Sequence, residues 1–193
     1  EEIGLSRQSN ADLAFCTTND TVQKPQNIKI IFEIKMSVVS NYKFLQPDTI
    51  EFVGDYKHHK GNPSLLRSDS MLKAIGKSIN IRVSGVDSSN IPIIILGNSP
   101  ITENYAKKVD FLKTSGVIQG FWSLNPKPTN TDYIKETQKY GFKTIENIDQ
   151  LKNDCNELIK SEMNFFSSMI SRTRLGEIIS IANRENSYAE KAE

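Results

Sequence analysis

Residues 91–96 form a continuous apolar run, Ile-Pro-Ile-Ile-Ile-Leu, bounded by Asn90 and Gly97. A run of this length between turn-forming residues is typical of a strand that is buried on both faces, at the centre of a sheet. Residues 102–114 then predict a helix, and residues 117–122 predict a further strand. The order strand, helix, strand favours a parallel crossover connection.

Two earlier segments predict an antiparallel pair of strands. Residues 11–16 and 28–37 are short and rich in β-forming residues. A polar connection that contains Asn19, Asp20 and Pro25 separates them, so we expect a hairpin. Together with the parallel crossover, this pair predicts an α/β fold with a central mixed β-sheet flanked by helices.

The rest of the chain favours helices. Residues 64–77 carry apolar residues at roughly helical spacing, which predicts a helix with a basic face. From about residue 130 to 185 the pattern is also helical, with helices expected at 148–169 and 173–183, packed on the sheet or on a partner. A chain of 193 residues with 37% hydrophobic residues suits one globular domain, so we treat residues 1–193 as a single domain.

Composition excludes several classes of protein. No run of about 18 apolar residues exists, so we expect no membrane-spanning helix. Cys16 and Cys155 each lack a neighbouring cysteine, which excludes a CxxC zinc or redox site and favours a reducing, cytoplasmic setting. The chain begins at Glu1 without a basic and apolar leader, so we expect no secretory signal, and the natural N-terminus can lie upstream. A net charge of +1 neither requires nor forbids a nucleic-acid partner.

Charged residues interrupt the predicted strand pair at four positions, Asp12, Lys29, Glu33 and Lys35. Within residues 28–36 the even positions are all apolar, whereas Glu33 and Lys35 share the opposite face, about 7 Å apart at their Cα atoms. Asp12 lies in the apolar segment that is expected to pair with this strand, where an aspartate is locally unfavourable. We therefore expect two carboxylates and one ammonium group to converge at the sheet.

This combination of groups suits the hydrolysis of a phosphodiester. The reaction needs neutralisation of the phosphate charge, which magnesium held by hard oxygen ligands supplies, and a water molecule activated by the metal and a nearby amine. Asp12, Glu33 and Lys35 resemble the D…ExK signature of the PD-(D/E)xK nuclease superfamily, and their surroundings look like a type II restriction endonuclease.

The resemblance implies a magnesium-dependent endonuclease that cuts double-stranded DNA and leaves a 5′-phosphate. It implies that Asp12 and Glu33 ligate Mg²⁺, with the Ile34 carbonyl as a further ligand, and that Lys35 orients or deprotonates the attacking water. It also implies a homodimer.

Four other positions bear on this resemblance. Family members often add a glutamate from a preceding helix, which here corresponds to Glu1 or Glu2. Ala11 stands where the family often has proline, so Asp20 is the alternative to Asp12 as a metal ligand.

Basic residues that follow the strand pair are candidates for binding DNA phosphates. Lys57 and Lys60 lie in a basic stretch beside Tyr56, and Arg67 and Lys73 lie on the predicted helix. A solvated loop and a solvated helix face are the alternative interpretations.

Other hypotheses stay open at this stage. The chain could be a DNA-repair or junction nuclease, because such enzymes share the same core motif. It could also be a non-catalytic DNA-binding module, in which Glu33 and Lys35 form only a surface ion pair. Asn98 and Ser99 follow a buried strand and either meet a ligand or form a structural turn. For Trp122 we favour a place in the core over base stacking.

Overall fold

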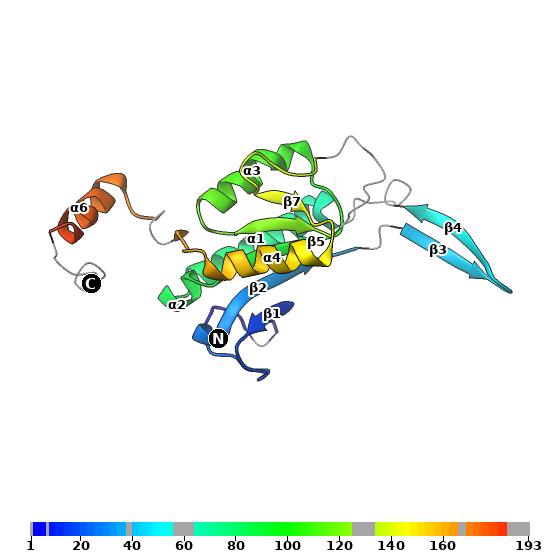
Figure 1. Cartoon of the computed structure of the whole chain (residues 1–193), viewed down its shortest axis with the longest axis horizontal. Coiled ribbons are helices and arrows are strands. Elements are labelled where there is room, and N and C mark those ends of the chain that lie inside the picture. The colour runs from blue at the N-terminus through cyan, green and yellow to red at the C-terminus, as the bar shows by residue number, and fades with distance from the viewer. Residues whose placement is uncertain are drawn as a thin grey trace.

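The computed structural model describes residues 2–6, 8–37, 40–55, 64–124, 134–165 and 169–184 (Figure 1). The strands are β1 (Leu13–Cys16), β2 (Ile28–Lys35), β3 (Ser40–Leu45), β4 (Thr49–Asp55), β5 (Ile93–Gly97), β6 (Gly120–Ser123) and β7 (Phe142–Thr144). The α-helices are α1 (Ser68–Arg82), α2 (Val86–Ser89), α3 (Glu103–Thr114), α4 (Ile148–Lys160) and α6 (Arg172–Ala182), with short 3-10 helices at Pro25–Asn27 and Ser64–Leu66.

Five of the strands form one mixed sheet in the order β1-β2-β5-β6-β7. β1 runs antiparallel to β2, whereas β5, β6 and β7 continue the sheet in parallel. The α/β fold with a mixed sheet and flanking helices is therefore confirmed, including the predicted antiparallel pair and the parallel crossover. In the register between β2 and β5, Glu33 lies opposite Ile95 and Lys35 lies opposite Gly97.

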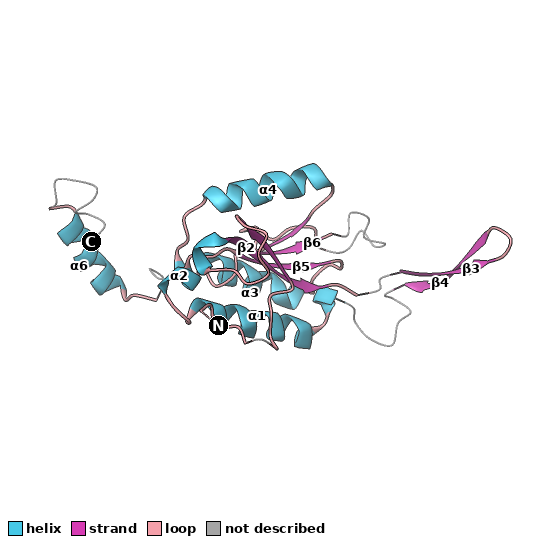
Figure 2. Cartoon of the chain, turned by 90° about the horizontal axis from the view of Figure 1, so that it is seen from below, coloured by secondary structure: helices cyan, strands magenta, loops and turns pink. Residues whose placement is uncertain are grey.

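Helices cover both faces of this sheet, α1 and α3 on one face and α4 on the other (Figure 2). Ile31 and Ile95 pack with Met71 of α1 on the first face, and Phe32 packs with Cys155 of α4 on the second. The face of β2 that carries charged residues is consequently an interior face, because α1 lies over it. Trp122, only 4% exposed, belongs to the core on the α4 side, as we favoured.

β3 and β4 form a separate two-stranded arm that extends from the body of the molecule (Figure 2). Tyr42 pairs with Phe52 across the arm, their ring centroids lie 5.4 Å apart, and both side chains are at least half exposed. We did not predict this hairpin from the sequence, although Pro47 and Asp48 form a turn signal between its strands.

The predicted helix at 148–169 is too long, because α4 ends at Lys160. Ser161 adopts an extended backbone, and the side-chain amide of Asn164 then donates to the carbonyl of Thr114 at the end of α3 at 2.9 Å. Phe165 is buried. The chain leaves the helix so that these two side chains can reach the body of the molecule.

The prediction of a helical region from 130 to 185 is also wrong in part, because β7 lies within it. Gly141 allows the approach to β7: a Cβ there would lie 2.4 Å from the backbone of Val109. Beyond α4, α6 contains no buried residue, so packing on the sheet is not observed for its described residues. None of the described helices combines the length and the apolarity needed to cross a membrane.

Candidate active site

The pairing of β1 with β2 brings Asp12 to the motif on β2. Leu13 lies opposite Phe32 in the antiparallel register, so Asp12, the residue before β1, comes beside Glu33 and Ile34. Oδ2 of Asp12 accepts a hydrogen bond from the backbone N–H of Ile34 at 2.7 Å. The structure therefore brings together residues that are 22 positions apart in the sequence.

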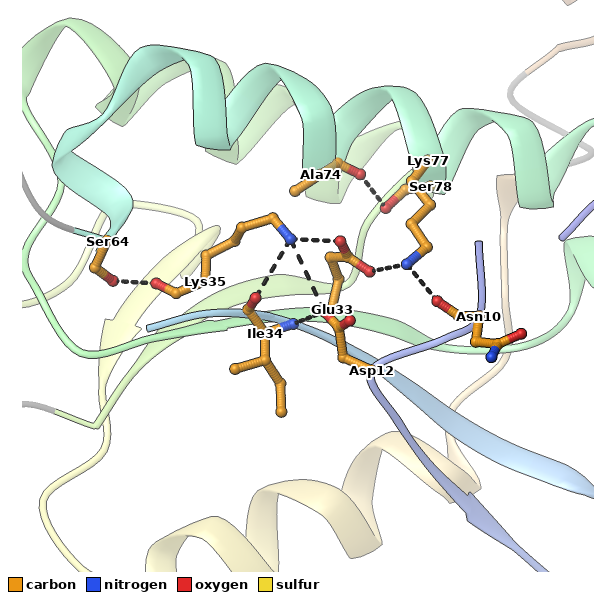
Figure 3. Close-up of polar contacts among 9 residues, drawn as sticks. All are labelled: Asn10, Asp12, Glu33, Ile34, Lys35, Ser64, Ala74, Lys77 and Ser78. Carbon is orange, nitrogen blue, oxygen red and sulfur yellow. Dashed lines mark hydrogen bonds and ion pairs between the residues drawn. The ribbon is translucent and has the colours of Figure 1, made fainter. Parts of the chain in front are cut away.

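The side-chain ammonium of Lys35 lies among oxygens from three residues (Figure 3). It forms an ion pair with Oε1 of Glu33, and it donates to the Ile34 carbonyl at 3.3 Å. Oδ2 of Asp12 lies 3.9 Å from the same nitrogen. The three residues that the sequence analysis assigned as metal ligands thus direct oxygens toward one cation.

A second lysine, which the sequence analysis did not include in the site, reaches the same glutamate from α1. Nζ of Lys77 lies 2.6 Å from Oε2 of Glu33 and donates to the Asn10 carbonyl at 2.6 Å (Figure 3). The contact with Oε2 is an ion pair and not a well-directed hydrogen bond. The only signal in the sequence was a lysine on a helix with a basic face, and helical spacing alone does not reveal which lysine meets β2.

These contacts explain how a carboxylate can be buried on β2. Glu33 is only 6% exposed, and burial of a carboxylate is costly unless the charge is paired. Lys35 and Lys77 contact one oxygen each. Asp12 is less enclosed, with 37% of its side chain exposed, so the cluster is open to solvent on the Asp12 side.

Backbone contacts support the end of β2 that carries the cluster. The hydroxyl of Ser64 donates to the Lys35 carbonyl and accepts from the backbone N–H of Asn98 at 3.0 Å. The side chain of Asn98 accepts from the backbone N–H of Ser37 at 3.0 Å and donates to its carbonyl at 2.7 Å. Ser99 accepts from the N–H of Leu65 at 3.0 Å. Asn98 and Ser99 therefore form a structural turn after β5, in which Asn98 contacts the segment that follows β2 and Ser99 contacts the 3-10 helix at Ser64–Leu66.

The oxygen set can hold a magnesium ion only with help from water and substrate. Among the residues that the structure describes, no group of three or more His, Cys, Asp or Glu side chains is placed to hold a metal. Asp12, Glu33 and the Ile34 carbonyl are two carboxylates and one carbonyl. Mg²⁺ is commonly bound by one or two carboxylates together with waters and substrate phosphate, so this set fits that arrangement and not an all-protein cage.

Of the three other acidic candidates, Glu1 lies outside the described residues, and Glu2 and Asp20 are not part of the cluster. Glu2 is exposed and does not make a third acid beside Asp12 and Glu33. Asp20 lies in the loop after Cys16, which pairs with Ile28 at the end of β2 far from Glu33. The antiparallel direction of β1 thus favours Asp12 over Asp20.

The predicted DNA-binding residues have different surroundings. Lys57 and Lys60 lie outside the described residues. Arg67 makes a two-pronged contact with Asp69, at 2.9 and 3.1 Å, and this hydrogen bonding lowers the pKa of Asp69. Lys73 is exposed on α1, one helical turn before the residue that contacts Glu33. Lys73 is therefore the better placed of the two described candidates for a phosphate contact.

The fold and the site define an α/β protein with a partly buried cluster of two carboxylates and two ammonium groups at the junction of β1, β2 and α1. Comparisons of the chain with protein family models, with curated proteins and with solved structures found no match. Any functional conclusion consequently depends on the geometry and chemistry of the cluster itself.

Proposed function

We propose that this protein is a magnesium-dependent endonuclease that hydrolyses phosphodiester bonds in double-stranded DNA, in the manner of a type II restriction endonuclease. The observation that carries the proposal is the convergence of Asp12 Oδ2, Glu33 Oε1 and the Ile34 carbonyl on the Lys35 ammonium. The positively charged ammonium group of Lys35 lies at the point where these oxygens meet.

Each residue has a role in this proposal. Asp12, Glu33 and the Ile34 carbonyl would hold the Mg²⁺, which supplies charge neutralisation at the phosphate and lowers the pKa of a bound water. Lys35 orients the attacking water, whose oxygen forms the new bond to phosphorus while the bond to the 3′ oxygen breaks. The products are a 5′-phosphate and a 3′-hydroxyl.

Binding of the duplex is assigned to basic residues near the cluster. Lys73 is exposed on the helix that also contacts Glu33, and Arg67 lies at the start of that helix. We propose that these residues, with Lys57 and Lys60, contact phosphates and so position DNA without reading its sequence.

Assembly and location are further parts of the proposal. Ile178, Ile179 and Ile181 of α6 are exposed, and these apolar side chains suit an interface in a homodimer. Both cysteines are free, which suits a reducing, cytoplasmic compartment.

Burial of Glu33 argues against the alternative of a non-catalytic module. That hypothesis treats Glu33 and Lys35 as a surface ion pair, yet only 6% of Glu33 is exposed and a second lysine contacts it. A repair or junction nuclease would use the same cluster, so substrate preference must separate it from a restriction enzyme.

The test is incubation of the full chain with supercoiled plasmid and with a four-way DNA junction, in Mg²⁺ and in a chelator. Discrete linear fragments that require Mg²⁺ support a restriction-type enzyme, whereas preferred cutting of the junction supports the repair-type alternative. Absence of cutting on both substrates in Mg²⁺ contradicts the nuclease proposal. The Lys35→Ala variant is the control for contaminating nucleases.

A further inference from the structure

One ammonium group joins three segments of the chain at the candidate active site. Lys77 projects from α1, its Nζ lies 2.6 Å from the Glu33 carboxylate of β2, and it donates to the carbonyl of Asn10 just before β1. Its side chain is 17% exposed. Lys77 is therefore enclosed with the acidic groups and is not part of a solvated helix face.

The formal charges of the cluster cancel. Asp12 and Glu33 supply two negative charges, and Lys35 and Lys77 supply two positive charges within contact distance. A divalent cation that enters such a cluster gains little from its net field, and it is repelled by any ammonium group that stays beside Glu33. A DNA phosphate brings the negative charge that would offset this repulsion.

We propose that Lys77 is a positioning residue that makes binding of the divalent cation depend on DNA. This inference rests on the proposed magnesium site. Lys77 occupies Oε2 of Glu33, which leaves Oε1 as the glutamate oxygen that meets Lys35, the ammonium that Asp12 and the Ile34 carbonyl also contact. Its charge keeps the affinity for the cation low until a phosphate enters, so that cation and DNA bind cooperatively.

A merely structural role for Lys77 makes the opposite prediction. If Lys77 only ties the Asn10 segment to α1, then its removal loosens the site and weakens cation binding. If its charge opposes the cation, then its removal strengthens cation binding in the absence of DNA. A divalent ion and a unit charge a few ångströms apart in water repel each other enough to change the affinity by at least about tenfold.

The experiment is a calorimetric titration of Mg²⁺ into the full chain without DNA. Lys77→Met should bind Mg²⁺ about tenfold more tightly than wild type, while Lys77→Arg, which keeps the charge, should match wild type. Lys107→Met is the control and should match wild type, because Lys107 is an exposed lysine on α3, the other helix on this face of the sheet. Cooperativity is then measured with Ca²⁺, which takes the same oxygen ligands, with and without a short duplex. The duplex should raise the cation affinity of wild type more than that of Lys77→Met.

Unchanged or weaker Mg²⁺ binding by Lys77→Met overturns the inference. If that variant does not fold, Lys77→Gln provides the test, because it keeps hydrogen-bond donors and removes the charge. Plasmid cleavage by the wild-type preparation is measured in parallel. Cleavage by wild type together with unchanged Mg²⁺ affinity in the variant rejects only the role of Lys77 and leaves the nuclease proposal in place. The expected rise in affinity without any cleavage supports that role and rejects the nuclease proposal.

Discussion

Oδ2 of Asp12 accepts a hydrogen bond from the backbone N–H of Ile34, at 2.7 Å, across the first two strands of the sheet. The Asp12 side chain therefore accepts the hydrogen bond that a backbone carbonyl of the neighbouring strand would otherwise accept from Ile34. This contact fixes one carboxylate oxygen beside the motif on β2 and makes Asp12 a precise target for substitution.

Asp12→Asn should separate metal binding from folding. The amide oxygen can still accept from Ile34, so the melting temperature should change little, while loss of the charge should lower Mg²⁺-supported cleavage by orders of magnitude. DNA affinity measured in a chelator should stay the same or increase, since one negative charge beside the phosphate is removed. Asp20→Asn is the control and should cleave at the wild-type rate. Retained cleavage by Asp12→Asn would exclude Asp12 as a ligand.

Lys35→Ala should abolish cleavage while the protein stays folded. The Lys35 ammonium contacts the oxygens on which the proposed chemistry depends. The variant should stay folded because Lys77 still pairs with the buried Glu33. Lys29→Ala, at the other end of the same strand, is the matched control. Single-turnover cleavage and a thermal melt of both variants provide the measurement. A near wild-type rate for Lys35→Ala would remove the role assigned to it.

Glu33→Gln should destabilise the fold as well as stop cleavage. The substitution leaves Lys35 and Lys77 without their shared carboxylate in a site that α1 covers. Because both lysines are partly exposed and can turn toward water, we expect a loss of about 1–3 kcal/mol in the free energy of unfolding. Urea denaturation measures it. Glu51→Gln on the exposed arm should change stability by less than about 0.5 kcal/mol, and equal effects at both positions would contradict the buried ion pairs.

Substitution of Arg67 and Lys73 together by alanine should weaken binding to all DNA sequences. Each lost phosphate contact should reduce the slope of log affinity against log salt by about 0.9. Since Arg67 is paired with Asp69, Lys73→Ala alone should account for most of the change. Lys152→Ala on α4, on the opposite side of the sheet, should leave the slope unchanged. If the double variant keeps the wild-type slope of log affinity against log salt, Arg67 and Lys73 do not contact DNA phosphates and belong to a solvated helix face.

Asp110→Asn should destabilise the protein at neutral pH and less so in acid. Burial alone would raise the pKa of Asp110, but hydrogen bonds from Thr137, Gly141 and Lys139 hold that pKa below its ordinary value of 3.8. The stability from the charged form is fully present above pH 3.8 and is lost as the pH falls through the lower pKa of the folded state. Urea denaturation at several pH values checks this, and a difference between variant and wild type that does not depend on pH would contradict it.

The sequence by itself determined the first strand pair, the central strand and the chemical motif. Residues 91–96 form a short apolar run that is rich in isoleucine and bounded by turn-forming residues, which favours a buried strand. The alternation on β2 placed Glu33 and Lys35 on one face. These patterns depend on neighbouring residues, so they can be read without the fold. Asp12 was a candidate from the sequence with Asp20 as the alternative, and the observed register of β1 on β2 places Asp12 beside Glu33.

The tertiary structure decided what covers that face and which distant groups reach it. α1 packs over the charged side of β2, so Glu33 is buried and Lys77 contacts it, although 44 positions separate the two residues in the chain. The end of α4 and the strand β7 depend likewise on contacts with α3, through Asn164 and Asp110. Helical spacing shows that a lysine lies on a helix face, but the direction of that face is set by the packing of the whole helix on the sheet.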